Sequence, residues 1–238
     1  KRYMHIEIPT TEQDTLRTNY TNNTKRAIFA YSFGYKNGLF KEHYPSGKLK
    51  VEGNFLNNER HGKWVWYYEN GNVESEYNYI YGDIDGEAKN YHENGKIEEI
   101  TPYDLGMRSG IEKSYTDKGV LLAELEFYDD RLTGKRYFYS ENGHLQLIRH
   151  YLNGQIIGFS YHNKEKKEID MIPLKSETGN IVSYYDNGNK SREMVIEKGL
   201  FQGKYIEYYY NGKIHQEQVY KDDKLEGTVT TYFEDGKL

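Results

Sequence analysis

The chain has 238 residues, a formal net charge of −5 and no cysteine, and only 36% of its residues are apolar. The missing cysteines exclude a disulfide framework and a thiolate metal site, and the charge lacks the basic excess that a nucleic-acid interface requires. No segment is long and apolar enough to span a membrane. The chain has 26 tyrosines and 9 phenylalanines, more aromatic residues than a disordered chain carries. Because aliphatic residues are few, tyrosine must do much of the packing.

The N-terminal part, residues 1–37, precedes the regular part of the sequence. Residues 1–27 show no period, and residues 6–24 are polar and rich in Thr and Asn, so we expect a cap or a leader. Residues 28–38 look like the second half of a degenerate earlier repeat. Because the sequence starts at Lys1 rather than at Met, we expect it to begin inside a longer chain, and no signal peptide is visible in it.

From residue 38 onward glycine recurs every 24 residues, which is typical of a repeat protein. The array covers residues 38–238 in nine copies, and the last copy ends at Leu238. The copy at 158–178 is shorter, loses its Asn-Gly dipeptide and gains the charged run KEKKE, so we expect a kink or an irregular loop there. The lead glycines are Gly38, Gly62, Gly86, Gly110, Gly134, Gly158, Gly179, Gly203 and Gly227.

Other positions repeat in phase with the lead glycine. A second glycine follows nine residues later, usually after Asn, and Asn-Gly between aromatic and β-branched runs predicts a hairpin because both residues tolerate positive φ. The lead glycine is expected to mark the bend between hairpins or a close approach of backbones. A tyrosine column lies five residues after the lead glycine, at Tyr67, Tyr91, Tyr115, Tyr139, Tyr184, Tyr208 and Tyr232.

These columns predict an all-β fold, an elongated single-layer antiparallel meander of stacked β-hairpin repeats. Apolar residues do not recur with helical spacing over any long window, and a turn signal arrives in nearly every copy. Each hairpin adds two strands and so advances the sheet by about 10 Å. Since no copy can bury its own face, stability is expected to be a sum over neighbouring copies.

The repeated unit resembles the MORN-repeat family in its bacterial variant form, which follows the pattern G-x-W-x-x-Y-x-x-N-G-x-φ. GKWVWYYENGNV at 62–73 and GKYIEYYYNGKI at 203–214 fit closely, and GEAKNYHENGKI at 86–97 and GKRYFYSENGHL at 134–145 fit without the Trp. The resemblance covers residues 38–238. It implies a β-hairpin array of bacterial origin, related to variant arrays that are labelled antitoxin components. The compartment stays open from the sequence, and we expect the cytoplasm or the periplasm and cell envelope of a bacterium.

We expect no enzyme, no cofactor and no metal site. None of the eight histidines forms an H-E-x-x-H or comparable spacing. The acidic pairs Asp129–Asp130 and Asp222–Asp223 fall where turns between copies belong, and strand neighbours such as Glu98–Glu99 point to opposite faces. A column of glutamates is interpreted as a solvated face or as an acidic track for a basic partner: Glu52, Glu76, Glu124, Glu193 and Glu217.

Aromatic residues that vary between copies are the candidates for partner binding, because exposed Trp and Tyr anchor protein interfaces. Alternation along the strand puts them opposite the tyrosine column, and extra packing on a thin sheet is the alternative interpretation. The candidates are Trp64, Trp66, Tyr68, His92, Tyr185 and Tyr209.

Three functions remain open from the sequence. The first is a non-catalytic protein-binding scaffold, an antitoxin or immunity protein that neutralises a toxin or effector. The second is an envelope or surface structural module that binds proteins or glycans. The third is membrane association, which the acidic charge disfavours because anionic lipid attracts Lys and Arg clusters. No nucleic acid is expected as a partner, and free sheet ends would allow a homodimer.

Overall fold

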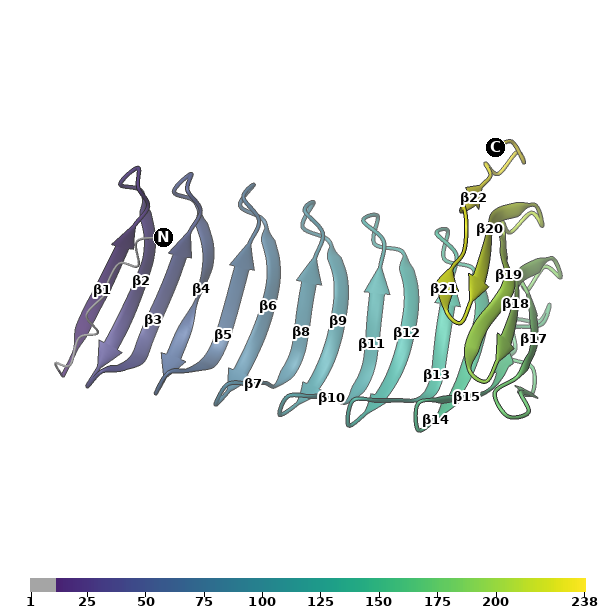
Figure 1. The fold of residues 1–238 in the computed structure, drawn as a ribbon, viewed down its shortest axis with the longest axis horizontal. Coiled ribbons are helices and arrows are strands. Elements are labelled where there is room, and N and C mark those ends of the chain that lie inside the picture. The colour runs from purple at the N-terminus through teal and green to yellow at the C-terminus, as the bar shows by residue number, and fades with distance from the viewer. Residues whose placement is uncertain (1–11) are drawn as a thin grey trace. The chain divides into compact units, whose positions relative to one another are not determined.

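The computed structural model describes residues 12–238 and divides them into two compact units, residues up to Arg108 and Ser109–Leu238. The described residues contain no helix, and therefore none that could cross a membrane. Consecutive strands pair antiparallel into open sheets, as the sequence predicts (Figure 1). The side-chain alternation of these strands buries one face and leaves tyrosine, glutamate and lysine on the other.

The first unit is a meander of hairpins in sequence order. Its strands are β1 (Asp14–Asn19), β2 (Lys25–Ser32), β3 (Tyr35–His43), β4 (Leu49–Leu56), β5 (Glu59–Tyr67), β6 (Val73–Ile80), β7 (Asp83–Ile84), β8 (Gly86–Tyr91), β9 (Ile97–Asp104) and β10 (Met107–Arg108).

The second unit contains two sheets. The strands of the first sheet are β11 (Gly110–Tyr115), β12 (Leu121–Tyr128), β13 (Arg131–Tyr139), β14 (Leu145–Leu152), β15 (Gln155–Ser160) and β16 (Ile172–Pro173). Those of the second sheet are β17 (Gly179–Tyr184), β18 (Lys190–Glu197), β19 (Leu200–Tyr208), β20 (Ile214–Lys221), β21 (Lys224–Leu225) and β22 (Thr230–Thr231).

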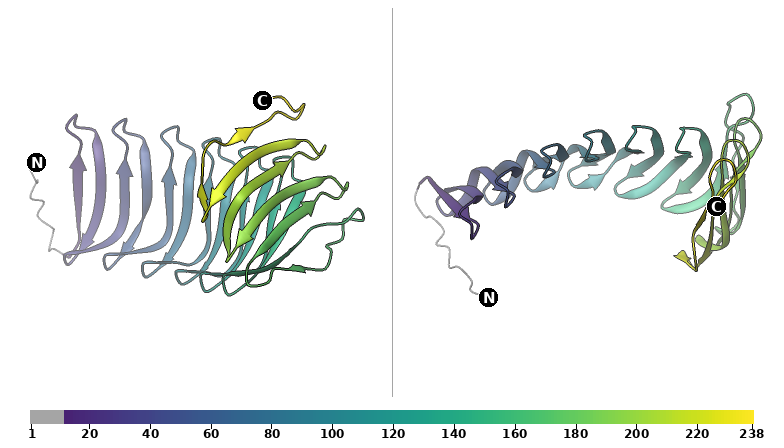
Figure 2. Two further views of the ribbon diagram at one scale, coloured as in Figure 1. Left: turned by 45° about the vertical axis from the view of Figure 1, so that its right-hand side comes forward. Right: turned by 90° about the horizontal axis from the view of Figure 1, so that it is seen from above.

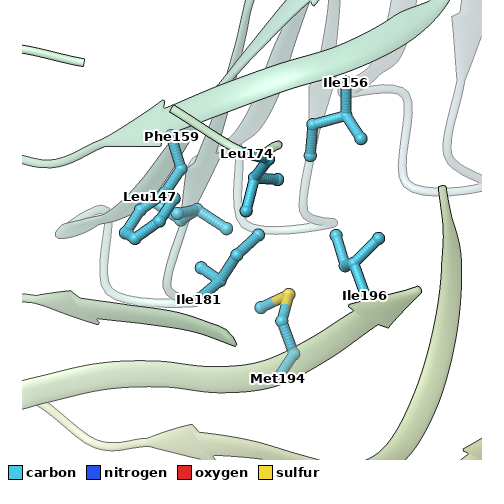
Figure 3. Close-up of a cluster of buried hydrophobic side chains, with 7 residues drawn as sticks. All are labelled: Leu147, Ile156, Phe159, Leu174, Ile181, Met194 and Ile196. Atoms are coloured by element: carbon cyan, nitrogen blue, oxygen red, sulfur yellow. The ribbon is translucent and has the colours of Figure 1, made fainter. Parts of the chain in front are cut away.

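The irregular copy at 158–178 is the place where the chain changes sheet. After it, β17 and β18 lie against β14, so the second sheet covers one face of the first (Figure 2). Seven buried apolar side chains fill the space between them (Figure 3): Leu147, Ile156, Phe159, Leu174, Ile181, Met194 and Ile196. Each sheet is thus a single layer of hairpins, and in the second unit two such layers share a core.

The first unit has a smaller core on the inner face of its sheet, the face that carries Trp64. Within it, Phe40 and Trp64 lie with their ring centroids 5.5 Å apart in a stacked arrangement. Trp64 also packs edge-on against Phe55, at 5.0 Å. The buried members of this cluster are Ala27, Phe40, Val51, Trp64 and Tyr79.

Each copy uses two kinds of turn. The loops that hold the second glycine, here called second-glycine turns, close with two backbone hydrogen bonds, for example Tyr68 N to Asn72 O at 2.8 Å and Gly71 N to Tyr68 O at 2.9 Å. Only the glycine there has a positive φ, 98° at Gly71, and Asn70 does not. The position of this turn is confirmed, but the reason given from the sequence was wrong, because this is a type I turn with a bulge and needs one left-handed residue.

The loops between copies, here called two-residue turns, are where both central residues take positive φ, as in a type I′ turn. They are Phe33–Gly34, Asn57–Asn58, Tyr81–Gly82, Leu105–Gly106, Asp129–Asp130, Asn153–Gly154, Ser176–Glu177, Lys198–Gly199 and Asp222–Asp223. The two acidic pairs therefore lie in turns between copies, as predicted.

The lead glycine does not mark the bend between hairpins. Gly62 lies inside β5 with φ 67°, and the pairing of β4 with β5 shifts register between Glu52 and Asn54. The lead glycine therefore sits in a β-bulge, which increases the local twist and bends the strand.

The array also begins earlier than the sequence period indicates. β1 and β2 form a complete hairpin, and Asn23, with φ 65°, occupies the turn position that glycine holds in later copies. Asn tolerates this conformation, which is why a search for glycines misses the copy. The remainder of the expected leader, residues 1–11, lies outside the described residues.

Candidate functional site

The tyrosines five residues after the lead glycine lie on the outer face, which is the face opposite Trp64. Several of them hydrogen-bond to the glutamate column. Tyr67 Oη donates to Glu52 Oε1 at 2.8 Å, and Tyr139 and Tyr232 make equivalent bonds to glutamates fifteen residues earlier. Burial raises the pKa of Tyr67 to about 12, with the Glu52 carboxylate adding to the effect.

Lysines neutralise the same glutamate column. Lys41 Nζ lies 2.9 Å from Glu52 Oε2, and the hydrogen bond from Lys41 is the largest influence that lowers the pKa of Glu52. Similar pairs join Lys63 to Glu76 and Lys113 to Glu124. These glutamates hold neighbouring copies together, and their charge is partly cancelled, so they do not present a bare acidic track.

A second tyrosine column ties successive second-glycine turns together. Tyr68 Oη donates to the backbone carbonyl of Tyr91 at 2.6 Å, and Tyr209 Oη donates to that of Tyr232 at 2.7 Å. The other members are Tyr20, Tyr44 and Tyr185. All of them except Tyr20 lie six residues after a lead glycine, and this spacing was the sequence signal that the sequence interpretation missed.

The predicted partner-binding residues divide between these structural roles and the surface. Trp64 and Tyr185 are each only 1% exposed, so neither can anchor a partner, and the expectation that they face outward is corrected. Trp66 is half-buried beside Tyr77, at a ring distance of 5.2 Å. Tyr68, His92 and Tyr209 are also partly exposed, each at the start of a second-glycine turn.

The structure brings two of the predicted residues together in the second unit. Tyr185 and Tyr209 line a cleft of about 390 Å³ with His215 and Arg192. Tyr185 forms part of its floor, where Gln146 Nε2 donates to the Tyr185 hydroxyl at 3.0 Å. The cleft therefore combines aromatic rings with amide and guanidinium groups. A larger hollow of about 760 Å³ lies beside β1 to β3 and is lined mostly by polar residues.

The two-residue turns of the first unit expose bulky apolar side chains that sequence reasoning did not single out. Phe33, Tyr81 and Leu105 are each more than half exposed, and Tyr35 and Met107 beside them are about half exposed. These five residues form what is called here the apolar turn edge. Phe33, Tyr81 and Leu105 have φ of 49°, 47° and 42°, although Asn, Asp or Gly is preferred at such a position.

One arrangement superficially resembles catalytic machinery. His150 Nε2 lies 2.7 Å from Ser160 Oγ, which donates to Glu168 Oε1 at 2.7 Å, and Lys135 Nζ pairs with Glu168. Ser160 is fully buried, and burial is the main cause that lowers the pKa of His150. This network holds the irregular copy against β14 and β15. No cluster of metal-ligating side chains occurs among residues 12–238.

Comparison with known proteins gives one similar solved structure and a family. No curated protein matches the chain. One similar solved structure is titled "Crystal Structure of TcdB2-TccC3-Cdc42"; it shares 11% identity with a TM-score of 0.20, and the match covers 89% of this chain. The chain spans only 14% of the length of that protein, and a similarity at this level supports no structural argument.

The family described as MORN repeat variant matches the chain six times. The matched segments are residues 36–57, 60–81, 84–105, 132–153, 201–222 and 225–238, which together make up more than half of the sequence. Five of them span the strands on either side of a second-glycine turn and stop at or next to a two-residue turn. The chain therefore belongs to the MORN repeat variant family.

Proposed function

We propose that this protein is a non-catalytic scaffold that binds a protein partner, and that the partner is a toxin which it neutralises as an antitoxin or immunity protein. The binding role agrees with a repeat array that offers an extended surface. The toxin is the partner that the sequence resemblance to bacterial arrays implies.

The observation that carries this proposal is the apolar turn edge. An exposed Phe, Tyr or Leu gains nothing from folding, and in the left-handed region a bulky side chain adds strain of about 1–3 kcal/mol. Asn57 occupies the same position between Phe33 and Tyr81, so the turn itself does not require an apolar residue. Large aromatic and aliphatic side chains spaced along one edge are what a protein interface uses as anchors.

The test is a triple variant, Phe33→Asn, Tyr81→Asn and Leu105→Asn, in the full chain. We expect it to be at least as stable as the wild type, because Asn suits the turn. In cells that express the partner, a small protein that arrests growth by itself, the wild type should restore growth and co-purify with that protein. The triple variant should do neither.

The matched control removes exposed side chains from the opposite edge of the same sheet, with Glu69→Ala and Glu93→Ala. It should restore growth as the wild type does. A triple variant that still restored growth would contradict the apolar turn edge as the interface. Trp66→Ala in the same assay tests whether the inner face contributes.

A second function, a surface module that binds glycans, is favoured by the cleft of the second unit. The rings of Tyr209 and His215 lie against each other at a tilt, with centroids 4.5 Å apart, and Gln146 and Gln216 supply amides in the same cleft. Aromatic platforms beside amides suit a sugar ring. Binding of soluble oligosaccharides that is lost in Tyr209→Ala would support this function. If the wild type bound no member of a broad oligosaccharide panel, the result would argue against it.

A further inference from the structure

Three arginines of the second unit converge on a single aromatic ring. The guanidinium carbons of Arg136 on β13, Arg149 on β14 and Arg192 on β18 lie 4.5, 4.8 and 4.9 Å from the ring centroid of Phe138. Arg149 is 6% exposed and Arg192 is 8% exposed. Any two of these charges are therefore within about 10 Å of each other, roughly a Debye length, and little water screens them.

Only one of the three arginines of this cluster makes an ion pair. Among residues 12–238, Glu207 is the one carboxylate within ion-pair distance, with Oε1 3.3 Å from Arg192 Nη2. Arg192 is also satisfied by Gln146 and by the Tyr205 hydroxyl. Arg136 and Arg149 make no ion pair with a carboxylate of residues 12–238. The cluster thus combines three permanent positive charges with one carboxylate in ion-pair contact.

Hydrogen-bond donors of the cluster are also left over. The Nε atoms of Arg136 and Arg149 are buried and have no acceptor in the described structure. Arg149 Nη2 approaches the Met194 sulfur at 3.1 Å, which is a weak acceptor. Burial lowers the pKa of Arg136, and repulsion from Arg149 and Arg192 contributes. Arginine does not lose its proton in proteins, so the cluster cannot relieve the imbalance by itself.

An opening beside the cluster leads to solvent. Arg149 and Tyr151 line a cavity of about 220 Å³ together with Phe201, and Tyr151 is also the side chain that supports the charge of Arg136. Two carboxylates, Glu177 and Asp223, line the same cavity, and Asp223 already accepts from the Phe201 backbone N–H. Their charge opposes a polyanion, so the cavity suits one compact oxyanion.

We propose that Arg136 and Arg149 form a binding site for a small oxyanion, either inorganic phosphate or the phosphate group of a small phosphomonoester. The nearby positive charge of Arg192 adds to the attraction for the anion. Guanidinium groups present planar forks that hold phosphate oxygens in pairs. An oxyanion would bring negative charge to Arg136 and Arg149, which lack an ion-pair partner, and would give their unpaired Nε donors acceptors. The site is independent of the partner-binding role proposed above.

The test uses the full chain and titrates inorganic phosphate or glycerol 3-phosphate against sodium chloride at constant ionic strength. We expect saturable binding of one anion per chain by calorimetry and by ³¹P NMR line broadening. The melting temperature should rise with phosphate, because a ligand that binds only the folded state stabilises it. Tighter binding of glycerol 3-phosphate would identify an ester as the ligand, and tighter binding of phosphate would identify the free ion.

The variants are Arg136→Gln and Arg149→Lys, with Arg131→Gln at the exposed end of the same strand β13 as the control. Arg136→Gln should weaken phosphate binding at least tenfold and remain folded, since it relieves repulsion, and its circular dichroism spectrum checks this. Arg149→Lys keeps the charge but loses the fork, so it should also bind more weakly. The control should bind as the wild type does.

Two results would overturn the proposal. One is the absence of saturable phosphate binding by the wild type up to about 10 mM, which does not depend on any variant. The other is unchanged binding in a folded Arg136→Gln protein.

Discussion

At the scale of the residue, Trp64 was expected from the sequence to be exposed for partner binding, but its side chain is part of the core. Its ring covers the backbone of Gly53, where a Cβ would collide with the ring, and its Nε1 donates to the Asn54 carbonyl at 2.9 Å. We expect Trp64→Ala to cost about 3–5 kcal/mol of unfolding free energy. Trp66→Ala, at a half-buried site, should cost clearly less. Denaturant unfolding followed by circular dichroism measures both, and equal costs would show that Trp64 is not the buried anchor.

The Tyr67–Glu52 pair predicts how stability depends on pH. The folded-state pKa of Tyr67 is raised to about 12, above the value of about 10 for an unfolded chain. Its contribution is therefore fully present below pH 10 and is lost as pH rises from 10 through 12. Glu52, with a lowered pKa, contributes above the unfolded glutamate pKa and loses its contribution as pH falls.

Tyrosine absorbance compared between the wild type and Tyr67→Phe should isolate this titration. The difference is expected to appear near pH 12 and not near pH 10. The substitution should also cost about 0.5–1.5 kcal/mol at neutral pH, the usual net value of one hydrogen bond. A difference titration centred at pH 10 would contradict the Tyr–Glu bond.

At the scale of the element, the second-glycine turn predicts an ordered substitution series. Gly71 has φ 98° and open space where a Cβ would lie, so any cost of substitution comes from the backbone conformation. Asn23 and Lys166 take positive φ in the corresponding turns. We expect Gly71→Ala to cost about 1 kcal/mol or more and Gly71→Asn to cost less, because Asn tolerates the left-handed region. Thermal unfolding of the two variants checks the order, and an Ala variant as stable as the Asn variant would refute it.

At the scale of the whole molecule, the two units carry separate buried clusters, and this separation predicts two observable transitions. Both tryptophans lie in the first unit, whereas Leu147 is fully buried in the second. We expect Leu147→Ala to cost about 2–5 kcal/mol in the second unit. The transition seen by circular dichroism should shift, while that seen by tryptophan fluorescence should shift much less. Equal shifts by both probes would mean that the chain unfolds as a single cooperative structure.

Much of the fold followed from sequence periodicity because backbone conformation is a local property. Glycine at fixed spacing, tyrosine between turns and acidic pairs at the copy boundaries each report conformation within a few residues. The candidate site was predicted less well. Trp64 and Tyr185 belong to repeat columns whose burial depends on the neighbouring copies, and the apolar turn edge became visible only when φ and exposure were known for Phe33, Tyr81 and Leu105.

The sequence by itself therefore determined the hairpin, its 24-residue period and the family, since each depends on residues close together in the chain. The tertiary structure alone decided that the second sheet lies against β14. This contact joins residues about 45 positions apart, such as Arg149 and Met194, and no repeat pattern encodes such a distance. Face-to-face packing then buried the second core and gathered Arg136, Arg149 and Arg192 around Phe138. The physical reason is that one layer of hairpins leaves its inner face to be covered, and the irregular copy allows the chain to cover it with its own later copies.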